Sequence, residues 1–359
     1  MASGEPYPLP LELADITTAW LEAALQNQHP GVGLTGHSVV DANHGTCTKV
    51  RIRLELDAAG KAAGIPDLVI LKGGFEPHSR MMHTMHAKEV RAYAGVAPHS
   101  PLRMPACHFA GYDEAGQQGI VIMDDLVARG VEFCHPQRPL TPDAAARRLA
   151  VLARHHALTW DSPNLASGGK FGWAEHVADA QYFDSVLVPE LWEKMIALPR
   201  GAAASVRFHD LGWMKTTLDR LGRFAKRLPT VLIHGDTHLG NLYVDTDGEP
   251  GFFDSLPHLA TPMYEVSYHI AGALDPADRR AHERALVSGY RDELRRCGID
   301  PPPLDALMHQ YGCFLANGYA IFLVNASEFQ PEAINTAYTA RFSAAMLDHD
   351  TIGLIAGLE

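Results

Sequence analysis

The stretch from residue 231 to residue 254, VLIHGDTHLGNLYVDTDGEPGFFD, constrains this chain more than any other. It contains three short apolar runs that are typical of strands, separated first by a polar loop and then by an Asp-Gly turn. The loop carries Asp236 and, five residues later, Asn241, and the third run ends on Asp254. We expect a hairpin to bring these three side chains to one end of a small sheet.

An aspartate, an asparagine and a further aspartate in this arrangement match the template for phosphoryl transfer. In that template one aspartate accepts the proton of the substrate hydroxyl, while the asparagine and the other aspartate hold Mg²⁺. We therefore predict that Asp236 is the catalytic residue and that Asn241 and Asp254 are the metal ligands.

The motif HGDTHLGN at residues 234–241, followed by Asp254, resembles the aminoglycoside phosphotransferase and choline kinase-like superfamily. The segments around Glu89 and Asp236 also resemble its ecdysteroid kinase-like branch. The resemblance implies an α+β protein kinase-like bilobal fold, with a small antiparallel sheet in the N-terminal lobe and a mostly helical C-terminal lobe. It also implies an ATP- and Mg²⁺-dependent kinase that phosphorylates a hydroxyl group of a small molecule. The chain departs from the family pattern at Ser255, where an aromatic or glutamine-type residue is usual.

Residues 43–48 form a predicted turn before a half-buried antiparallel strand at residues 49–56, where apolar and charged side chains alternate strictly. By itself the turn is typical of an ordinary hairpin, because it contains a single glycine. At the start of a kinase lobe, the resemblance makes it the loop that covers the phosphates of ATP, with backbone N–H groups and hydroxyls as donors. The candidate phosphate-binding residues are Gly45, Thr46 and Thr48.

The next predicted strand, residues 68–72, ends on Lys72. A lysine at the end of a strand commonly reaches into solvent. The resemblance instead makes Lys72 the lysine that pairs with the α- and β-phosphates. Glu89, within a helix predicted for residues 81–98, takes the position of the glutamate that orients this lysine, and we expect the two side chains to pair.

Residues 106–112 and 119–123 predict two more strands of the same sheet, and the second strand runs into acidic residues. In the resembled family the corresponding segment is the hinge between the lobes, and its backbone groups bind the adenine edge. The expected hinge residues are Met123, Asp124, Asp125 and Leu126. We therefore expect a nucleotide-binding lobe at residues 1–125 and a catalytic and acceptor-binding lobe at residues 126–359.

The chain is predicted to be largely helical beyond the hinge. Because neighbouring residues on a helix do not face the same side, one of the adjacent His155 and His156 is expected to pack inside and the other to be exposed. Residues 304–325 predict an apolar helix that is rich in aromatic residues. Most of its side chains are typical of a core helix, but it could also line an apolar acceptor site. The candidate lining residues are Tyr311, Phe314 and Tyr319.

Composition narrows the class of protein. The net charge of −12 argues against a general nucleic-acid binder, which needs a basic surface. No apolar run approaches the roughly 20 residues of a membrane helix. The five cysteines are scattered and no signal peptide is visible, so we expect a cytoplasmic protein with reduced thiols.

Two other classes of function remain open. His234, Asp236 and His238 alternate along the chain and could bind the metal of a metal-dependent hydrolase. That hypothesis leaves Asn241 and Lys72 without a function. The second class is a kinase-like binding protein without catalysis, which the intact set of polar residues disfavours.

The acceptor is the least constrained part of the prediction. The aromatic helix at residues 304–325 carries Asp305 as its only fully charged residue, which favours a relatively apolar alcohol. Residues 301–359 contain six acids and one base, which mildly favours a cationic acceptor of the aminoglycoside or choline type. A hydroxyacyl-CoA acceptor also remains open.

Overall fold

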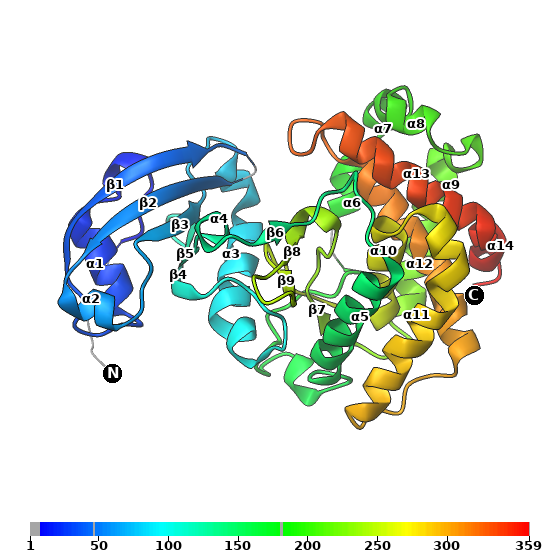
Figure 1. Cartoon of the computed structure of the whole chain (residues 1–359). Helices are drawn as coiled ribbons and strands as arrows, with labels where there is room; N and C mark the ends of the chain where they lie inside the picture. The colour runs from blue at the N-terminus through cyan, green and yellow to red at the C-terminus, as the bar shows by residue number, and fades with distance from the viewer. Residues whose placement is uncertain (1–7, 46, 180–181, 359) are drawn as a thin grey trace. The chain divides into compact units, whose positions relative to one another are not determined.

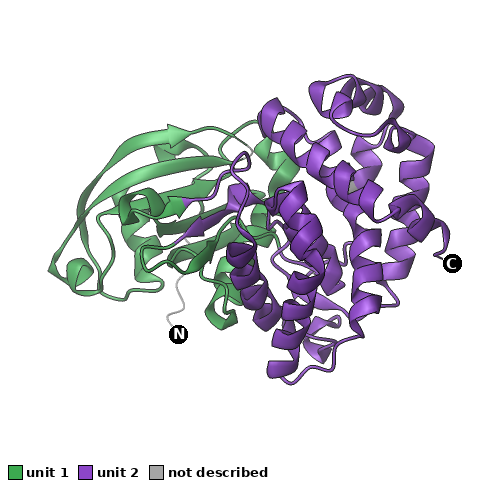
Figure 2. Cartoon of the chain, turned by 45° about the vertical axis from the view of Figure 1, so that its right-hand side comes forward, with its two compact units in different colours: residues 1–132, 245–256 green, residues 133–244, 257–359 purple. Residues whose placement is uncertain are grey.

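The computed structural model describes residues 8–45, 47–179 and 182–358. The chain divides into two compact units, which Figure 2 shows in green and purple. Unit 1 contains residues 1–132 and 245–256, and unit 2 contains residues 133–244 and 257–359.

Unit 1 is built on a five-stranded antiparallel sheet with the strand order β1-β2-β3-β5-β4 (Figure 1). The strands are β1 (Leu34–Asn43), β2 (Thr48–Leu56), β3 (Leu68–Gly73), β4 (Cys107–Asp113) and β5 (Gln118–Asp124). The antiparallel sheet that the alternating sequence patterns predict is therefore confirmed.

Helices cover the sheet of unit 1 on both faces. Alternate residues of a strand point to opposite faces. Ile120 and Ile122 of β5 accordingly join the core under α1 (Thr18–Gln26). Val121, between them, joins a second core under α3 (His83–Arg91). The inner strand β5 is therefore buried from both sides, and the predicted hinge begins at its end.

The helical segment predicted for residues 81–98 is present, but only part of it is regular α-helix. It consists of α3, which continues as a π-helical turn Ala92–Val96 and a 3₁₀ turn Ala97–His99. Pro98, which lacks an N–H group, lies in the final 3₁₀ turn, where the helical segment ends. Two further short helices of unit 1 are α2 (Ala58–Ala62) and α4 (Leu126–Arg129).

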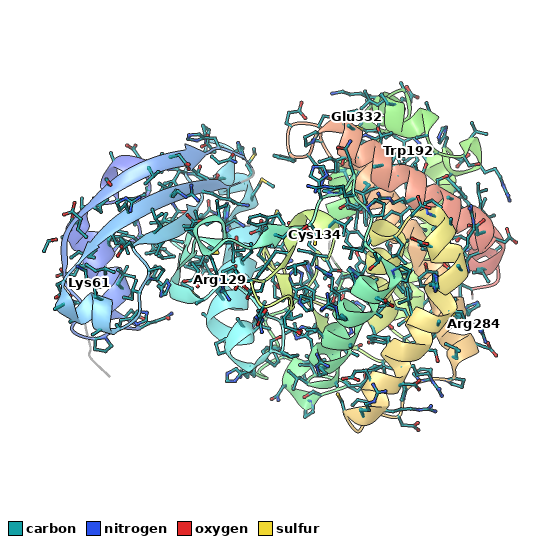
Figure 3. All side chains as sticks on the ribbon, in the orientation of Figure 1. Lys61, Arg129, Cys134, Trp192, Arg284 and Glu332 are labelled. Carbon is teal, nitrogen blue, oxygen red and sulfur yellow. The ribbon has the colours of Figure 1, made fainter. Side chains whose placement is uncertain are left out.

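The segment 245–256 is tied to the rest of unit 1 by a buried carboxylate. The side chain of Asp245 is fully buried and accepts hydrogen bonds from Arg103 (3.0 Å) and Arg129 (2.5 Å), the latter labelled in Figure 3. The N–H of Phe252 in β9 (Pro250–Phe252) donates to the carbonyl of Arg103. These contacts place Asp254, at the end of the segment, within the same unit as β2 and β3.

Unit 2 is mostly helical, as predicted. Five of its helices begin with proline within their first turn, where the missing N–H group costs nothing. Its helices are α5 (Pro142–Ala157), α6 (Tyr182–Val186), α7 (Pro189–Ile196), α8 (Pro199–Ala202), α9 (Leu211–Ala225), α10 (Pro262–Ala273), α11 (Pro276–Arg296), α12 (Leu304–Val324), α13 (Glu332–Asp348) and α14 (Thr351–Ala356).

Helix α12 lies in the middle of unit 2 and packs against α7, α9, α10, α11, α13 and α14. Every residue from 310 to 320 is buried. An apolar surface on all sides of a helix is what such complete packing requires. Despite this apolarity, each helix within the described ranges is too short or too polar to cross a membrane.

The strand that precedes the catalytic motif does not belong to the predicted hairpin sheet. β7 (Val231–Ile233) pairs antiparallel with β10 (His258–Ala260), with Leu232 opposite Leu259. The polar loop after β7 contains a 3₁₀ turn, Leu239–Asn241. The remaining short strands near it are β6 (Glu132–Phe133) and β8 (Leu242–Val244).

Candidate active site

The loop after β7 opens with a glycine in the left-handed region. Gly235 has φ +93°, a backbone conformation that residues with a side chain rarely adopt. The N–H groups of His234 and Gly235 donate to Oε2 (3.2 Å) and Oε1 (2.8 Å) of Glu265 on α10. A buried carboxylate therefore fixes the two residues that directly precede Asp236.

Glu265 is itself held by a chain of buried polar groups. Nε2 of His156 lies 3.0 Å from Oε2 of Glu265, and the hydroxyl of Tyr290 lies 2.8 Å from Nδ1 of His156. Burial alone would raise the pKa of Glu265, but the hydrogen bond and charge of His156, with help from the loop, outweigh it and lower the pKa to about 2.

The expectation that one of His155 and His156 would be exposed is wrong, because both are buried, at 2% and 0% exposure. Helix α5 packs against α11, α10 and β7, so it has neighbours on more than one side. His156 reaches Glu265, while burial, with the neighbouring imidazole, lowers the pKa of His155 to about 3.

Two neutral donors orient the carboxylate of Asp236. The hydroxyl of Tyr268 donates to Oδ1 (3.0 Å), and Nδ2 of Asn241 donates to Oδ2 (2.8 Å). Nε2 of His238 lies 3.5 Å from Oδ2. Burial raises the pKa of Asp236, but His238, His234 and Tyr268 together outweigh it and lower the pKa below its ordinary value. Asp236 is therefore an ionised acceptor whose direction is fixed.

The nitrogen and the oxygen of the Asn241 side-chain amide have different roles. Its nitrogen donates to both the carboxylate and the backbone carbonyl of Asp236. Its oxygen is the end that suits a hard cation such as Mg²⁺. The structure thus brings Asp236 and Asn241 together within unit 2, as the sequence spacing predicts.

Within unit 1, Lys72 lies between two carboxylates. Its Nζ donates to Oε1 of Glu89 (2.7 Å) and to Oδ1 of Asp254 (2.8 Å), and its side chain is 7% exposed. Burial alone would lower the pKa of Lys72, but the two carboxylates outweigh it and raise the pKa well above its ordinary value. The expected pairing of Lys72 with Glu89 is present, and Asp254 joins it.

Asp254 has a second lysine neighbour that the sequence analysis did not single out. Nζ of Lys49 on β2 donates to Oδ2 of Asp254 (3.1 Å). Asp254 also has φ +53°, an uncommon conformation for a residue with a side chain. Although burial raises the pKa of Asp254, Lys49 and Lys72 outweigh it and hold the pKa well below its ordinary value.

The predicted phosphate loop is anchored to the segment after β3. Nε2 of His78 donates to the carbonyl of Gly45 (2.9 Å). Thr48 is fully buried, and its hydroxyl donates to Glu76 (2.8 Å). Thr46 lies outside the described residues. The Thr48 hydroxyl is therefore already hydrogen-bonded to another side chain of the protein.

The predicted hinge residues make local contacts at the end of β5. Met123 is buried under Tyr93, whose hydroxyl lies 3.2 Å from its sulfur. Asp124 lies 2.9 Å from His108, and its N–H donates to the carbonyl of Ala106.

The carboxylate of Asp125 caps helix α4. It accepts hydrogen bonds from the N–H groups of Val127 and Ala128, and Arg51 donates to its other oxygen (2.5 Å). Leu126 is the first residue of that helix and is buried. The side chain of Asp125 therefore stabilises the chain's turn into α4.

The geometry disfavours the metal-dependent hydrolase. Among the residues that the structure describes, no group of three or more His, Cys, Asp and Glu side chains is arranged to hold a metal ion. The ring of His238 packs edge-on against Phe322 and Tyr338.

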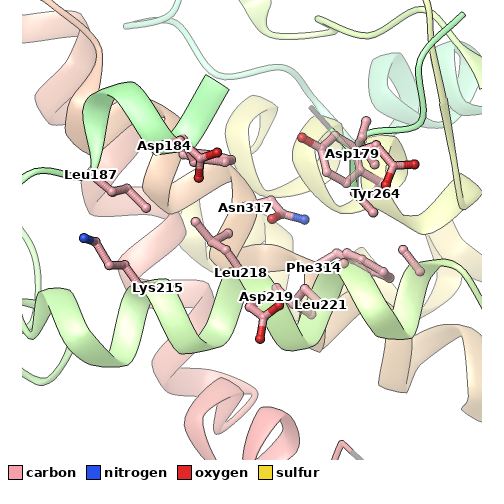
Figure 4. Close-up of a pocket in the computed structure, with 15 residues that line it drawn as sticks. Asp179, Asp184, Leu187, Lys215, Leu218, Asp219, Leu221, Tyr264, Phe314 and Asn317 are labelled. Carbon is pink, nitrogen blue, oxygen red and sulfur yellow. The ribbon is translucent and has the colours of Figure 1, made fainter. Parts of the chain in front are cut away.

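A cavity of about 600 Å³ lies within unit 2 (Figure 4). Side chains from α9, α12 and the segment around α6 line it. Its buried lining includes Leu187, Leu221, Phe314 and Asn317, and its exposed lining includes Asp179, Asp184, Lys215 and Asp219. Such a volume is typical of small-molecule sites.

Of the three aromatic residues expected to line an acceptor pocket, only Phe314 lines this cavity. Tyr311 packs against His349 (ring centroids 5.1 Å apart), and Tyr319 packs against Phe208 (5.6 Å). Because α12 is surrounded by other helices, most of its aromatic side chains pack in the core.

One turn of α10 connects the cavity to Asp236. Tyr264 lines the cavity and packs edge-on against Phe314. Tyr268 donates to Asp236 and stacks on Phe322. Residues four apart lie on the same face of a helix and about 6 Å apart along its axis. Tyr268 and Glu265 were both missed in the sequence, where a carboxylate inside the apolar run PMYEVSYHIAGAL was the available signal.

The solved structures that match this chain include an aminopropanol kinase, an ethanolamine kinase and an aminoglycoside phosphotransferase. A microcompartment-associated aminopropanol kinase is 15% identical (TM-score 0.49; 94% of this chain and 98% of that chain covered). An ethanolamine kinase from Plasmodium vivax is 11% identical (0.49; 86% and 81%). The GDP complex of an aminoglycoside 2'-phosphotransferase is 10% identical (0.45; 94% and 99%).

No curated protein matches the chain at a significant level. The sequence model of the phosphotransferase enzyme family, in contrast, matches residues 83–298, which is more than half of the chain. The matched range includes Glu89, Asp236, Asn241 and Asp254. The chain therefore belongs to the phosphotransferase enzyme family and is a small-molecule kinase whose acceptor is an alcohol group.

Proposed function

We propose that the protein transfers the γ-phosphate of ATP, together with Mg²⁺, to a hydroxyl group of a relatively apolar small molecule. The observation that carries the nucleotide part is the buried ammonium of Lys72 between Glu89 and Asp254. A buried ion cluster is weak support for stability, because desolvation offsets much of the attraction between its charges. Buried ionisable groups whose pKa values are shifted by charged partners gather at functional sites, and this supports the assignment.

The side chains at this site are of the types that bind Mg²⁺ and phosphate. Asn and carboxylate oxygens are the ligands that Mg²⁺ prefers, and lysine is a common phosphate-binding residue. In the proposal Asn241 and Asp254 hold Mg²⁺, Lys72 holds phosphate oxygens and Glu89 positions Lys72. When bound, the metal neutralises part of the phosphate charge.

The other predicted contacts remain part of the proposal. The loop of Gly45, Thr46 and Thr48 binds phosphates through its backbone N–H groups, because the Thr48 hydroxyl already donates to Glu76. The backbone of the hinge, from Met123 through Asp124 and Asp125 to Leu126, binds the base. Residues 1–125 are thus proposed as the nucleotide-binding lobe and residues 126–359 as the catalytic and acceptor-binding lobe.

Asp236 accepts or orients the proton of the acceptor hydroxyl. Tyr268 and Asn241 fix its two oxygens, so the carboxylate needs no reorientation when the acceptor arrives. Its lowered pKa keeps it ionised at neutral pH. An ionised carboxylate of low pKa is a weak base, so positioning the hydroxyl is its larger contribution.

The cavity offers an apolar acceptor one apolar wall. Leu187, Leu221 and Phe314 form this wall, while the exposed part of the lining is largely polar. An acceptor that buries apolar area there gains roughly 25 cal/mol per Å².

The lining itself holds three acids and one base, but two of the acids are paired with cations from outside the lining, so few carboxylates are left for a polycation. Asp179 pairs with Lys226 and Asp219 pairs with Arg223. The third acid, Asp184, shares the lining with Lys215. A polycation would lose hydration without an excess of carboxylates to replace it.

An ATP-consumption screen tests the proposal. The acceptors are sterols, macrolides, hydroxyacyl thioesters, choline and aminoglycosides, and the measurement is ADP formed with Mg²⁺ present. We expect ADP formation with an apolar alcohol and little with kanamycin-type compounds. Efficient, salt-sensitive phosphorylation of aminoglycosides, with no activity on apolar alcohols, would contradict the proposed acceptor class.

A further inference from the structure

Two lysines on neighbouring strands converge on one carboxylate in unit 1. Lys49 of β2 is the direct cross-strand partner of Lys72 of β3 in the antiparallel register. Side chains at paired positions lie on the same face of a sheet, and like charges directly opposite one another are destabilising. Here both ammonium groups donate to Asp254, Lys72 to Oδ1 and Lys49 to Oδ2. The pair is therefore arranged to hold an anion between its two charges.

The two lysines differ in their other contacts. Lys72 also donates to Glu89 and is 7% exposed. Lys49 is 40% exposed, and its ammonium lies 5.9 Å from the ring centroid of Phe253. If Asp254 turns to a metal ion, Lys72 keeps a carboxylate partner, whereas Lys49 loses the carboxylate that it contacts. Its ammonium then needs a new anion.

We propose that Lys49 is a second phosphate-binding lysine, which exchanges Asp254 for a phosphate oxygen when the nucleotide binds. The inference rests on the proposed function, because it assumes that Asp254 holds Mg²⁺. No covalent bond is formed or broken in this exchange. One charge-assisted hydrogen bond, from Nζ to a carboxylate oxygen, is replaced by another, to a phosphate oxygen.

A purely structural role for Lys49 predicts the opposite sign. If Lys49 served only to hold Asp254 in place, its removal would leave nucleotide affinity unchanged or increase it, because Asp254 would be freer to bind the metal. If Lys49 binds phosphate, its removal weakens nucleotide binding. The sign of the change in affinity therefore separates the two roles.

The test is isothermal titration calorimetry of the full chain with MgATP, and with MgGTP in parallel. The variants are Lys49→Met and Lys49→Arg. The control is Lys61→Met, which also removes one lysine charge from unit 1. Lys61 is exposed on α2, and Figure 3 labels it. Unfolding temperatures without nucleotide show that each variant folds, and Lys49→Gln serves if Lys49→Met does not.

For the nucleotide that binds the wild type more tightly, we expect Lys49→Met to raise Kd roughly tenfold or more. Lys49→Arg should recover part of the loss, and Lys61→Met should bind like the wild type. Unchanged or tighter binding by Lys49→Met overturns the inference while the proposed function stands, provided that Asp254→Ala removes the magnesium-dependent affinity. A wild type that binds neither nucleotide overturns both.

Discussion

Replacing Glu265 by glutamine should destabilise the protein in a pH-dependent way. Glu265 is 2% exposed and accepts hydrogen bonds from His156 and from the N–H groups of His234 and Gly235. Glutamine keeps the shape and one acceptor oxygen but loses the charge. The variant therefore isolates the contribution of the ionised carboxylate to the loop that carries Asp236.

The magnitude follows from the pKa of Glu265, which is lowered from 4.5 to about 2. One pKa unit corresponds to about 1.4 kcal/mol, so the carboxylate contributes about 3 kcal/mol to the free energy of unfolding at pH 7. Because the folded pKa lies below the unfolded one, this contribution is complete above about pH 5 and is lost as the pH falls through about 2. At pH 3 roughly 1 kcal/mol should remain.

Urea denaturation of wild type and Glu265→Gln between pH 7 and pH 3 measures this difference. Glu193→Gln, an exposed carboxylate on α7 in the same unit, is the matched control and should change stability by less than about 0.5 kcal/mol. The difference in unfolding free energy between wild type and Glu265→Gln should narrow by more than half by pH 3. A gap that is absent at pH 7, or that does not change with pH, would refute the reasoning.

Three further predictions concern other parts of the molecule. MgATP should raise the unfolding temperature of the wild type, and Asp254→Ala should abolish the magnesium-dependent part of the rise in a thermal-shift assay. Phe314→Asp should raise the KM of an apolar acceptor more than that of ATP in steady-state kinetics, because it places a charge in the cavity lining. Arg200 is fully buried and donates to Glu332 and to the carbonyls of Phe322 and Leu323 near the end of α12. Because Arg200→Met leaves these acceptors unpaired, it should lower the free energy of unfolding by about 3 kcal/mol in urea titrations.

Sequence patterns within a few residues predicted strands and contacts between neighbours in the chain. The alternation in residues 49–56 predicted β2, and the spacing of five residues placed Asn241 on Asp236. The pairing of Lys72 with Glu89 was also expected, but from the family resemblance.

Contacts between distant segments could not be predicted in the same way. Lys49 looks like the charged side of an alternating strand, and only the β2–β3 register and the turn at Asp254 bring it to that carboxylate. Tyr268 and Glu265 lie in an apolar helix whose sequence suggests scaffold, and their contacts depend on how α10 packs beside β7.

The helix at residues 304–325 shows a further feature that the sequence alone does not predict. The aromatic side chains of residues 304–325 are equally compatible with a core and with a binding site. The packing of α12 decides between the two, and it buries Tyr311 and Tyr319 against other rings while Phe314 reaches the cavity.

The central claim is that Asp236 directs phosphate transfer from ATP to a hydroxyl group. The most direct measurement is mass spectrometry of an acceptor found in the screen, incubated with MgATP and either wild type or Asp236→Asn. We expect the wild type to form one phosphorylated acceptor per ADP, and Asp236→Asn to lower turnover by a factor on the order of 10² or more while binding MgATP as tightly as the wild type. Near wild-type phosphorylation by a correctly folded Asp236→Asn variant would contradict the account.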